Sequence, residues 1–247
     1  MTGMDVSYPQ CGKTLPSGEA FSVVGLNDGL ANTTNPCFSS ELTWAQGASG
    51  STSLPKTMLY VNTANPGNLG VADWPVNNID PVTLGADVVA DPYGSCTTGS
   101  NGQGLDNQAC AWQYGYNLGD EDANTRGVPS ARSFIWWLDV ETGNSWDSNT
   151  ANNDADLQGM VDYFHYIGSV AGGNVGVYST SYQWAKIAGT TGLPGELIGL
   201  PDWIPGARNL SGAKSNCRVT PLTRGATVTV TQWTGSYDYD YDCATWT

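Results

Sequence analysis

Residues 134–146 read FIWWLDVETGNSW. Large apolar side chains lead into Asp139, and beyond Val140 and Glu141 the sequence turns small and polar. A short apolar run bounded in this way predicts a strand that is buried on both faces, as in a parallel sheet. Side chains two positions apart in a strand point to the same side, so we expect Asp139 and Glu141 to face the same way. The strand therefore ends on a pair of neighbouring carboxylates.

Similar strand candidates occur on both sides of this segment, with helical stretches between them. They lie at residues 3–9, 20–27, 57–62, 174–180, 201–206 and 226–233, with a weaker one at 85–92. The clearest helix is predicted at 152–170, where Asn and Asp caps precede apolar residues at helical spacing. Further helices are predicted at residues 39–46 and 180–189 and within 99–123.

This alternation of strands and helices predicts an α/β protein whose parallel sheet is covered on both sides. About seven or eight such strands in a chain of 247 residues predict a TIM-like β/α barrel. No Pro/Ser-rich or Gly/Ser-rich linker divides the chain, so we expect residues 1–247 to form a single domain. The long Gly- and Asn-rich segments 63–110 and 206–225 are expected to be loops that build a site.

The composition restricts the possible partners. Only 13% of the residues are charged and the formal net charge is −14, so we expect no binding to nucleic acid phosphates or to an anionic membrane surface. No apolar run reaches about 18 residues, the length that a membrane-spanning helix needs. We therefore expect a monomer whose partner is neutral or only locally charged.

The six cysteines are widely spaced and form no CxxC pair. Because His165 is the one histidine, we predict no metal site and expect no cofactor. An even cysteine count indicates disulfides and hence an oxidising, extracellular compartment. The order of the cysteines suggests the pairs Cys11–Cys37, Cys96–Cys110 and Cys217–Cys243, which is one of fifteen possible connectivities.

Polar side chains gather where the predicted strands end. They are Asp5, Ser7, Asn27, Asp28, Tyr60, Asn62, Asp139, Glu141, Tyr178, Ser179, Trp203, Gln232 and Trp233. Each one alone could be a cap or a loop residue, but the active sites of β/α barrels lie where the strands end, so the collection predicts a site. His165 lies in the predicted helix 152–170, away from these ends, and is expected to be a packing residue.

The carboxylate pair suggests a specific chemistry. Two neighbouring carboxylates raise the pKa of one of them, and burial against Trp136 or Trp137 would raise it further. A carboxyl that stays protonated beside an ionised partner is what a general acid needs to cleave a glycosidic bond. The alternative from spacing alone is that both carboxylates cap loops or bind an ion. No GxSxG, P-loop or GxGxxG motif follows a predicted strand.

Five segments resemble those of glycoside hydrolase family 25, the secreted lysozyme-like muramidases. They are GMDVSYPQ, LDVE, VGVYSTSYQW, PDWIPG and VTVTQWTGSYDYDYD, which occur in the order of the family and cover most of the chain. The resemblance implies an irregular β/α barrel. It also implies that Asp5 is the first-strand acid, that Asp139 and Glu141 are the central pair with Glu141 as general acid, and that Tyr60 is the active-site tyrosine.

The end of the chain matches the family less clearly. Asp238 best matches the acid after the last strand, and Asp240 follows closely because the YDYDYD repeat leaves the register open. The cysteines and the long segment 63–133 depart from ordinary muramidases and resemble a divergent group of secreted actinobacterial proteins.

We therefore predict a secreted glycoside hydrolase of a bacterial cell-wall polysaccharide, with peptidoglycan first. Glu141, Asp139 and Asp5 are the predicted catalytic residues. The predicted substrate-binding residues are Asn27, Tyr60, Asn62, Tyr178, Trp203, Gln232, Asp238 and Asp240. The alternatives are a hydrolase of another envelope glycan, such as an arabinan or a galactan, and a carbohydrate-binding protein without turnover.

Overall fold

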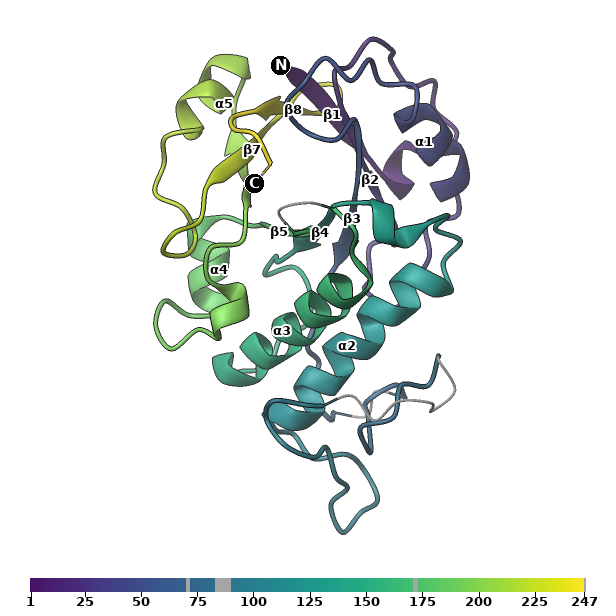
Figure 1. Ribbon diagram of the computed structural model, residues 1–247, viewed down its shortest axis with the longest axis vertical. Coiled ribbons are helices and arrows are strands. Elements are labelled where there is room, and N and C mark those ends of the chain that lie inside the picture. Colours follow the sequence, from purple (N-terminus) through teal and green to yellow (C-terminus); the bar gives the residue numbers. More distant parts are fainter. Residues whose placement is uncertain (70–71, 83–89, 171–172, 247) are drawn as a thin grey trace.

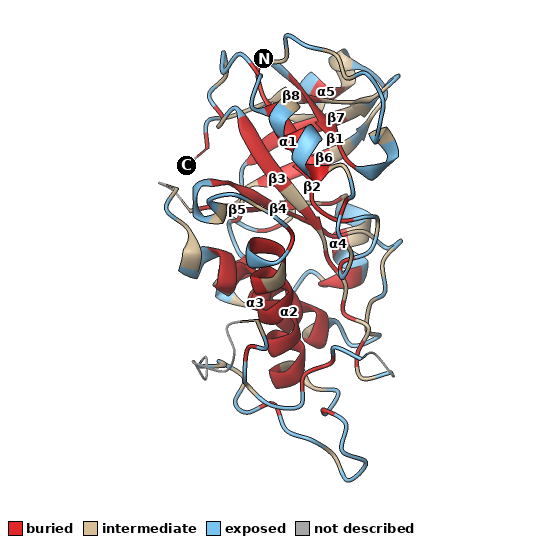
Figure 2. Ribbon diagram, turned by 90° about the vertical axis from the view of Figure 1, so that its right-hand side faces the viewer, coloured by how far each residue is buried: buried red, intermediate tan, exposed pale blue. Residues whose placement is uncertain are grey.

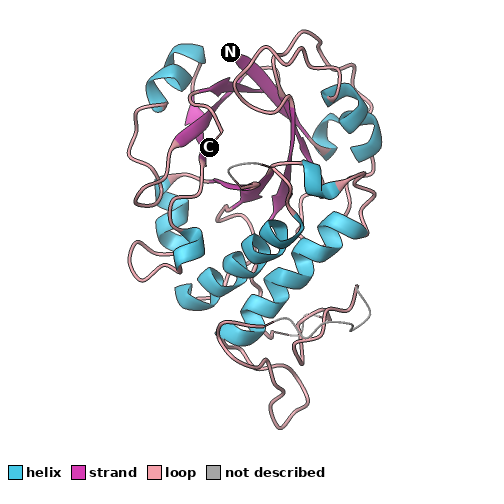
Figure 3. Ribbon diagram, in the orientation of Figure 1, coloured by secondary structure: helices cyan, strands magenta, loops and turns pink. Residues whose placement is uncertain are grey.

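Eight strands close into a barrel in the computed structural model, which describes residues 1–69, 72–82, 90–170 and 173–246. The strands follow one another around the ring in chain order, and the helices lie outside it (Figures 1 and 3). The strands are β1 (Thr2–Val6), β2 (Ser22–Gly25), β3 (Thr57–Asn62), β4 (Trp136–Asp139), β5 (Val175–Tyr178), β6 (Asp202–Ala207), β7 (Val228–Thr234) and β8 (Asp238–Asp242). The predicted α/β barrel is thus confirmed.

The closing strand differs from the prediction. Strands β1 to β7 pair in parallel, whereas β8 is antiparallel to both β7 and β1. The eighth strand is therefore the YDYDYD segment, which the sequence suggested only as a turn and a last acid. Most of the weaker candidate at 85–92 lies outside the described residues, and residues 90–92 belong to no strand. The antiparallel last strand makes this barrel irregular.

Five α-helices surround the ring. They are α1 (Phe38–Ala45), α2 (Gln108–Asn124), α3 (Thr150–Ile167), α4 (Ser181–Ile187) and α5 (Leu210–Asn216), with short 3-10 helices at Tyr8–Gln10, Ala131–Ser133 and Gly195–Leu197. Side-chain caps begin several of them: Asn107 accepts from the Cys110 amide, and Thr180 accepts from the Gln183 amide. Helix α5 was not predicted, and His165, expected to pack, is exposed near the end of α3.

Helices α2 and α3 lie side by side below the barrel (Figures 1 and 2). Two glycines allow the backbones to approach closely. A Cβ atom at Gly159 would lie 2.0 Å from the Trp112 carbonyl oxygen, and one at Gly115 would lie 1.9 Å from the Asp156 carbonyl oxygen. The described part of 72–106 packs on this pair, since Tyr93 donates to Gln158 and Cys96 is bonded to Cys110.

Aromatic side chains fill the interior of the barrel. The ring centroid of Trp137 lies 5.7 Å from that of Trp203 and 5.3 Å from that of Trp246, both edge-on. Met58 and Ile135 are fully buried in the same cluster. A second, larger apolar cluster joins residues of the strands to residues of α2 and α3, and Figure 2 shows that most of these two helices is buried. Because the interior is filled, a cleft can open only at the end of the barrel where the parallel strands end.

Three disulfides join the cysteines in sequence order. Cys11 is bonded to Cys37, Cys96 to Cys110 and Cys217 to Cys243, as predicted. The first bond ties the loop after β1 to the start of α1, the second fixes the first turn of α2, and the third joins the end of α5 to the residue after β8. None of the described helices combines the length and apolar character that crossing a membrane requires.

Candidate active site

A cleft of about 250 Å³ opens where the parallel strands end. Its lining residues are Asp5, Tyr60, Asp139, Glu141, Tyr178, Trp203, Gln232, Thr234 and Asp238. They come from β1, β3, β5, β6, β7 and β8 and from the end of β4, so every strand except β2 contributes. All three predicted catalytic residues and five of the predicted substrate-binding residues meet here.

Asp139 is the most deeply buried member of the central pair. Its Oδ2 accepts a hydrogen bond from Asn62 Nδ2 at 3.0 Å, and its Oδ1 has no partner among the described residues. Burial, followed by the charges of Glu141 and Asp5, raises the pKa of Asp139 well above its usual range. Asp139 therefore holds a proton at pH values where an exposed aspartate would be ionised.

Glu141 lies two positions beyond the end of β4 and is half-buried. Its Oε1 accepts from Gln183 Nε2 in α4 at 3.3 Å. Its backbone oxygen accepts from Trp146 Nε1 at 2.8 Å, which holds the residue at the rim. The predicted shared direction of the two carboxyls agrees with this placement, because both line one cleft.

Asp5 approaches the pair from β1. Its Oδ2 accepts from Gln232 Nε2 at 2.9 Å, and Gln232 Oε1 accepts from the Tyr178 hydroxyl at 3.0 Å. Burial and the charge of Asp238 raise the pKa of Asp5 to about 7. Burial likewise raises the pKa of Tyr60 and Tyr178, so both phenols stay neutral donors.

The protein-sequence comparisons return nothing: no family model matches the chain, and no curated protein matches it either. Solved structures do match. A muramidase from Acremonium alcalophilum superposes with a TM-score of 0.54 at 16% identity, covering 98% of this chain and 93% of that chain. A family GH25 lysozyme from Aspergillus fumigatus superposes with a TM-score of 0.54 at 13% identity, covering 97% and 91%.

A third match is the modular autolysin LytC from Streptococcus pneumoniae, solved with a synthetic peptidoglycan ligand. It has a TM-score of 0.55 at 12% identity and covers 97% of this chain and 46% of that chain. The fold is that of glycoside hydrolase family 25. The resemblance noted in the sequence is thus confirmed at the level of the fold.

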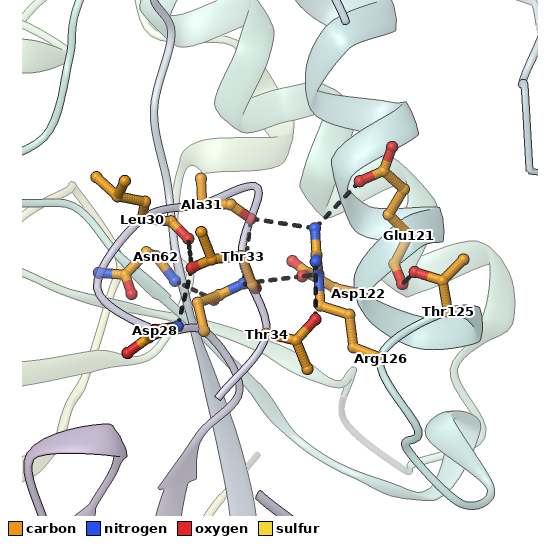
Figure 4. A network of polar contacts seen from close by, with 11 residues as sticks. Asp28, Leu30, Ala31, Thr33, Thr34, Asn62, Glu121, Asp122, Thr125 and Arg126 are labelled. Atoms are coloured by element: carbon orange, nitrogen blue, oxygen red, sulfur yellow. Dashed lines mark hydrogen bonds and ion pairs between the residues drawn. The ribbon is translucent and has the colours of Figure 1, made fainter. Parts of the chain in front are cut away.

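Asn27 does not line the cleft of this family 25 fold, although it was predicted to bind substrate. Its Nδ2 donates to the backbone oxygens of Ala31 and Thr33 and to Asp122 Oδ1, and its Oδ1 accepts from the Asn62 amide. Figure 4 shows the network, in which Arg126 also contacts Asp122. Asn27 therefore joins the loop after β2 to β3 and α2.

Two other predicted residues lie beside or beneath the cleft instead of lining it. Asn62 reaches it indirectly, through its hydrogen bond to Asp139. Asp240 is fully buried, and its Oδ1 accepts from Trp203 Nε1 at 2.9 Å. Conversely, Thr234 lines the cleft and donates to Asp238 Oδ1 at 3.0 Å, although it was not predicted. Thr234 lies two residues after Gln232 on β7, so both side chains face the same side of the strand, and this spacing could have predicted Thr234 as a cleft residue.

The two long loops do not build the site as expected. No cleft residue comes from the described parts of 63–110 or from 206–225. A larger hollow of about 430 Å³ does lie between residues 72–81 and α2, but no barrel strand contributes to it. Asp73 and Glu121 are its carboxyls, and no sequence-predicted site residue lines it. The carboxyls predicted to act as acid and base therefore line the smaller cleft.

No described group of three or more His, Cys, Asp or Glu side chains is arranged to hold a metal ion. The carboxyls of the cleft instead accept hydrogen bonds from side-chain amides and from one hydroxyl. Such a cleft can donate a proton, stabilise positive charge and orient a polar ligand against aromatic rings.

Proposed function

We propose that this chain is an exported glycoside hydrolase that cleaves a glycosidic bond in a bacterial cell-wall polysaccharide, with peptidoglycan as the first substrate to test. The observation that carries the proposal is the meeting of Asp139, Glu141, Asp5 and Asp238 in one cleft on the family 25 fold. The ligand of the LytC structure supports the choice of substrate. The three disulfides support export to an oxidising compartment.

In the proposed mechanism, Glu141 protonates the oxygen of the leaving sugar as the bond from that oxygen to the anomeric carbon breaks. Asp139 stabilises the positive charge that develops at the anomeric carbon. The oxygen of a water molecule then completes the hydrolysis by bonding to that carbon, and the proton that the water releases restores the acid. Burial raises the pKa of Asp139, so a proton is held beside Glu141, which stands half-buried at the rim. Asn62 and Gln183 hold the two carboxyls from opposite sides of the pair.

The charge of the cleft favours a substrate whose sugar backbone is neutral. Four carboxyls line it, and none of the described lining residues is a lysine, an arginine or a histidine. A phosphate or uronate group placed in the cleft would meet like charges without a cationic partner. Tyr60, Tyr178 and Trp203 supply ring surface and hydroxyl groups, which suit the apolar face and the hydroxyls of a sugar.

The test is a glycan panel of peptidoglycan, arabinan and galactan, with new reducing ends measured for the wild type, Glu141→Gln and Glu196→Gln. Glu141→Gln keeps the volume but has no proton to donate, so we expect a loss of turnover of about 10²–10⁴-fold or more. It should still bind the glycan. Glu196 is exposed in a 3-10 helix that does not line the cleft, so its variant is the matched control.

Each outcome decides between the candidates. Turnover of peptidoglycan that Glu141→Gln abolishes supports the proposal. Turnover of arabinan or galactan alone would move the substrate to another envelope glycan. Binding without turnover by the wild type would assign a carbohydrate-binding role, and full activity of Glu141→Gln would place the acid elsewhere.

A further inference from the structure

Strand β8 brings two acids to the site, at different depths. Asp238 pairs with Asp5 across the β1–β8 ladder and lines the cleft. Asp240 lies one step lower, where it pairs with Gly3 on one side and with Gln232 on the other. Its side chain is fully buried. Asp240 is therefore cut off from a ligand in the cleft, although it lies next to residues that line it.

The surroundings of Asp240 favour a protonated carboxyl. Its Oδ1 accepts from Trp203 Nε1 at 2.9 Å, and Asp5 on the adjacent strand β1 is the acid whose charge affects it most. Ionised carboxylates are acceptors only, so these two carboxyls can form a hydrogen bond only if one of them carries a proton. Asp5 already accepts from Gln232 Nε2, whereas no described donor reaches Asp240 Oδ2.

We propose that Asp240 is a neutral acid that donates a hydrogen bond to Asp5 when Asp5 ionises, so that it positions the Asp5 carboxylate in the cleft, while Asp238 is the last-strand acid that meets the ligand. Asp240 is thus a positioning residue. The consequence for turnover rests on the proposed function, whereas the protonation of Asp240 does not.

The surroundings support the placement of the proton. The titratable groups that face Asp240 are Asp5 on β1, Asp238 on β8 and Tyr178 on β5. All are acidic, and no described ion pair involves Asp240. Burial, followed by the charge of Asp5, raises the pKa of Asp240 well above its usual range. An ionised Asp240 would have Trp203 as its one donor against two neighbouring acids.

The first test compares thermal unfolding of the wild type and Asp240→Asn between pH 4 and 8. Asparagine resembles the neutral acid, because its oxygen can accept from Trp203 and its amide can donate to Asp5. A buried acid that stays protonated binds more protons in the folded state than in the unfolded state, so its contribution to stability falls as pH rises above about 4. Asp240→Asn removes this loss. The Tm of Asp240→Asn minus that of the wild type should therefore increase with pH.

Asp238→Asn is the matched control, since it removes a negative charge from the same strand without touching Trp203. A Tm difference for Asp240→Asn that stays flat or falls with pH would overturn the proposal. A rise just as large for Asp238→Asn would also overturn it, because net charge would then explain the trend.

A second measurement tests the protonation of Asp240 even if Asp240→Asn does not fold. The carboxyl carbon of Asp240 is followed by NMR in the wild-type protein as the pH is varied. We expect the signal of a protonated acid through neutral pH. Titration near pH 4, together with the exposed carboxylates, would contradict the proposal.

The turnover arm uses the substrate identified by the glycan panel. Asp240→Ala removes the donor to Asp5, so kcat should fall by about tenfold or more, the usual worth of a hydrogen bond to a charged group. Asp240→Asn should recover most of that loss, and failure to recover it would mean that Asp240 acts as an ionised group. If no glycan is cleaved, the proposed function fails, while the unfolding and NMR measurements still decide the state of Asp240.

Discussion

The Asp139 carboxyl accepts a hydrogen bond from a single described donor, Asn62. A hydrogen bond to a carboxylate favours the ionised form, so its loss raises a pKa that burial has already raised. We expect Asn62→Ala to lower kcat by about tenfold, with a smaller effect on KM, in line with the loss of one hydrogen bond to a charged group. The acidic limb of the pH–rate profile should move to higher pH.

The measurement is a pH–rate profile of Asn62→Ala beside that of Asn101→Ala. Asn101 is exposed in a loop and bonds only to Gln103 among the described side chains, so its variant should match the wild type. An unshifted profile for Asn62→Ala would show that Asn62 does not control the protonation of the pair.

The sequence predicted the acids of the cleft better than the residues around them. The spacing of two between Asp139 and Glu141 and the strand-end position of Asp5 depend on local geometry, which the sequence carries. Asn27 also follows a strand, but its partners are Ala31, Thr33 and the distant Asp122 on α2. Whether a side chain lines a cleft or joins such a network depends on tertiary contacts, and the alternation of residues along a strand does not reveal these contacts.

At the scale of elements, the contact between α2 and α3 depends on glycine. We expect Gly159→Ala to destabilise the protein by about 1–3 kcal/mol, the usual cost of overpacking, because its Cβ would lie 2.0 Å from the Trp112 carbonyl oxygen. Urea unfolding measures this free energy. Gly195→Ala is the matched control, since no atom lies within 4 Å of its Cβ position. Equal stability of the two variants would mean that the helices shift apart at little cost.

The helices and strands that were predicted carry clear apolar patterns in the sequence, whereas those that were missed do not. Strands β3 and β4 are apolar runs, and α3 carries caps and apolar residues at helical spacing, so all three were predicted. Strand β8 alternates Asp and Tyr over five residues, so its polar face resembled a turn. Helix α5 spans only Leu210–Asn216 and buries Ala213 alone, which leaves no apolar stripe to recognise.

At the scale of the whole molecule, many buried acids make folding sensitive to pH. Burial is the main cause that raises the pKa values of several acids. It raises them to about 7 for Asp5, Asp122, Asp154 and Asp202. It raises them well above the usual range for Asp139, Asp156 and Asp240. Each of these groups binds more protons in the folded than in the unfolded state between pH 4 and its folded pKa. Stability should therefore fall as pH rises from about 4 to 7 and beyond.

Urea unfolding at several pH values from 4 to 8 measures this trend. The net charge of −14 acts in the same direction, because self-repulsion grows as the acids ionise. We expect the highest unfolding free energy in mildly acidic buffer. A maximum at pH 7 or above would show that water or counter-ions compensate the buried carboxylates in the folded protein.

The overall architecture was predictable because strand number and chain length together favour one closed form. The direction of the last strand was not, since a β/α barrel ordinarily closes on a parallel strand. An antiparallel last strand follows from the short connection between β7 and β8, which leaves no room for a crossover helix.

The insertion of β8 between β1 and β7 makes assembly of the cleft a late event. Asp5 stands near the start of the chain, yet its hydrogen-bond donor Gln232 and its neighbour Asp240 come from the far end. A ribosome-bound chain that lacks residues 228–242 has neither the closed ring nor one wall of the cleft. The topology therefore delays any activity of the cleft until synthesis has passed the last strand.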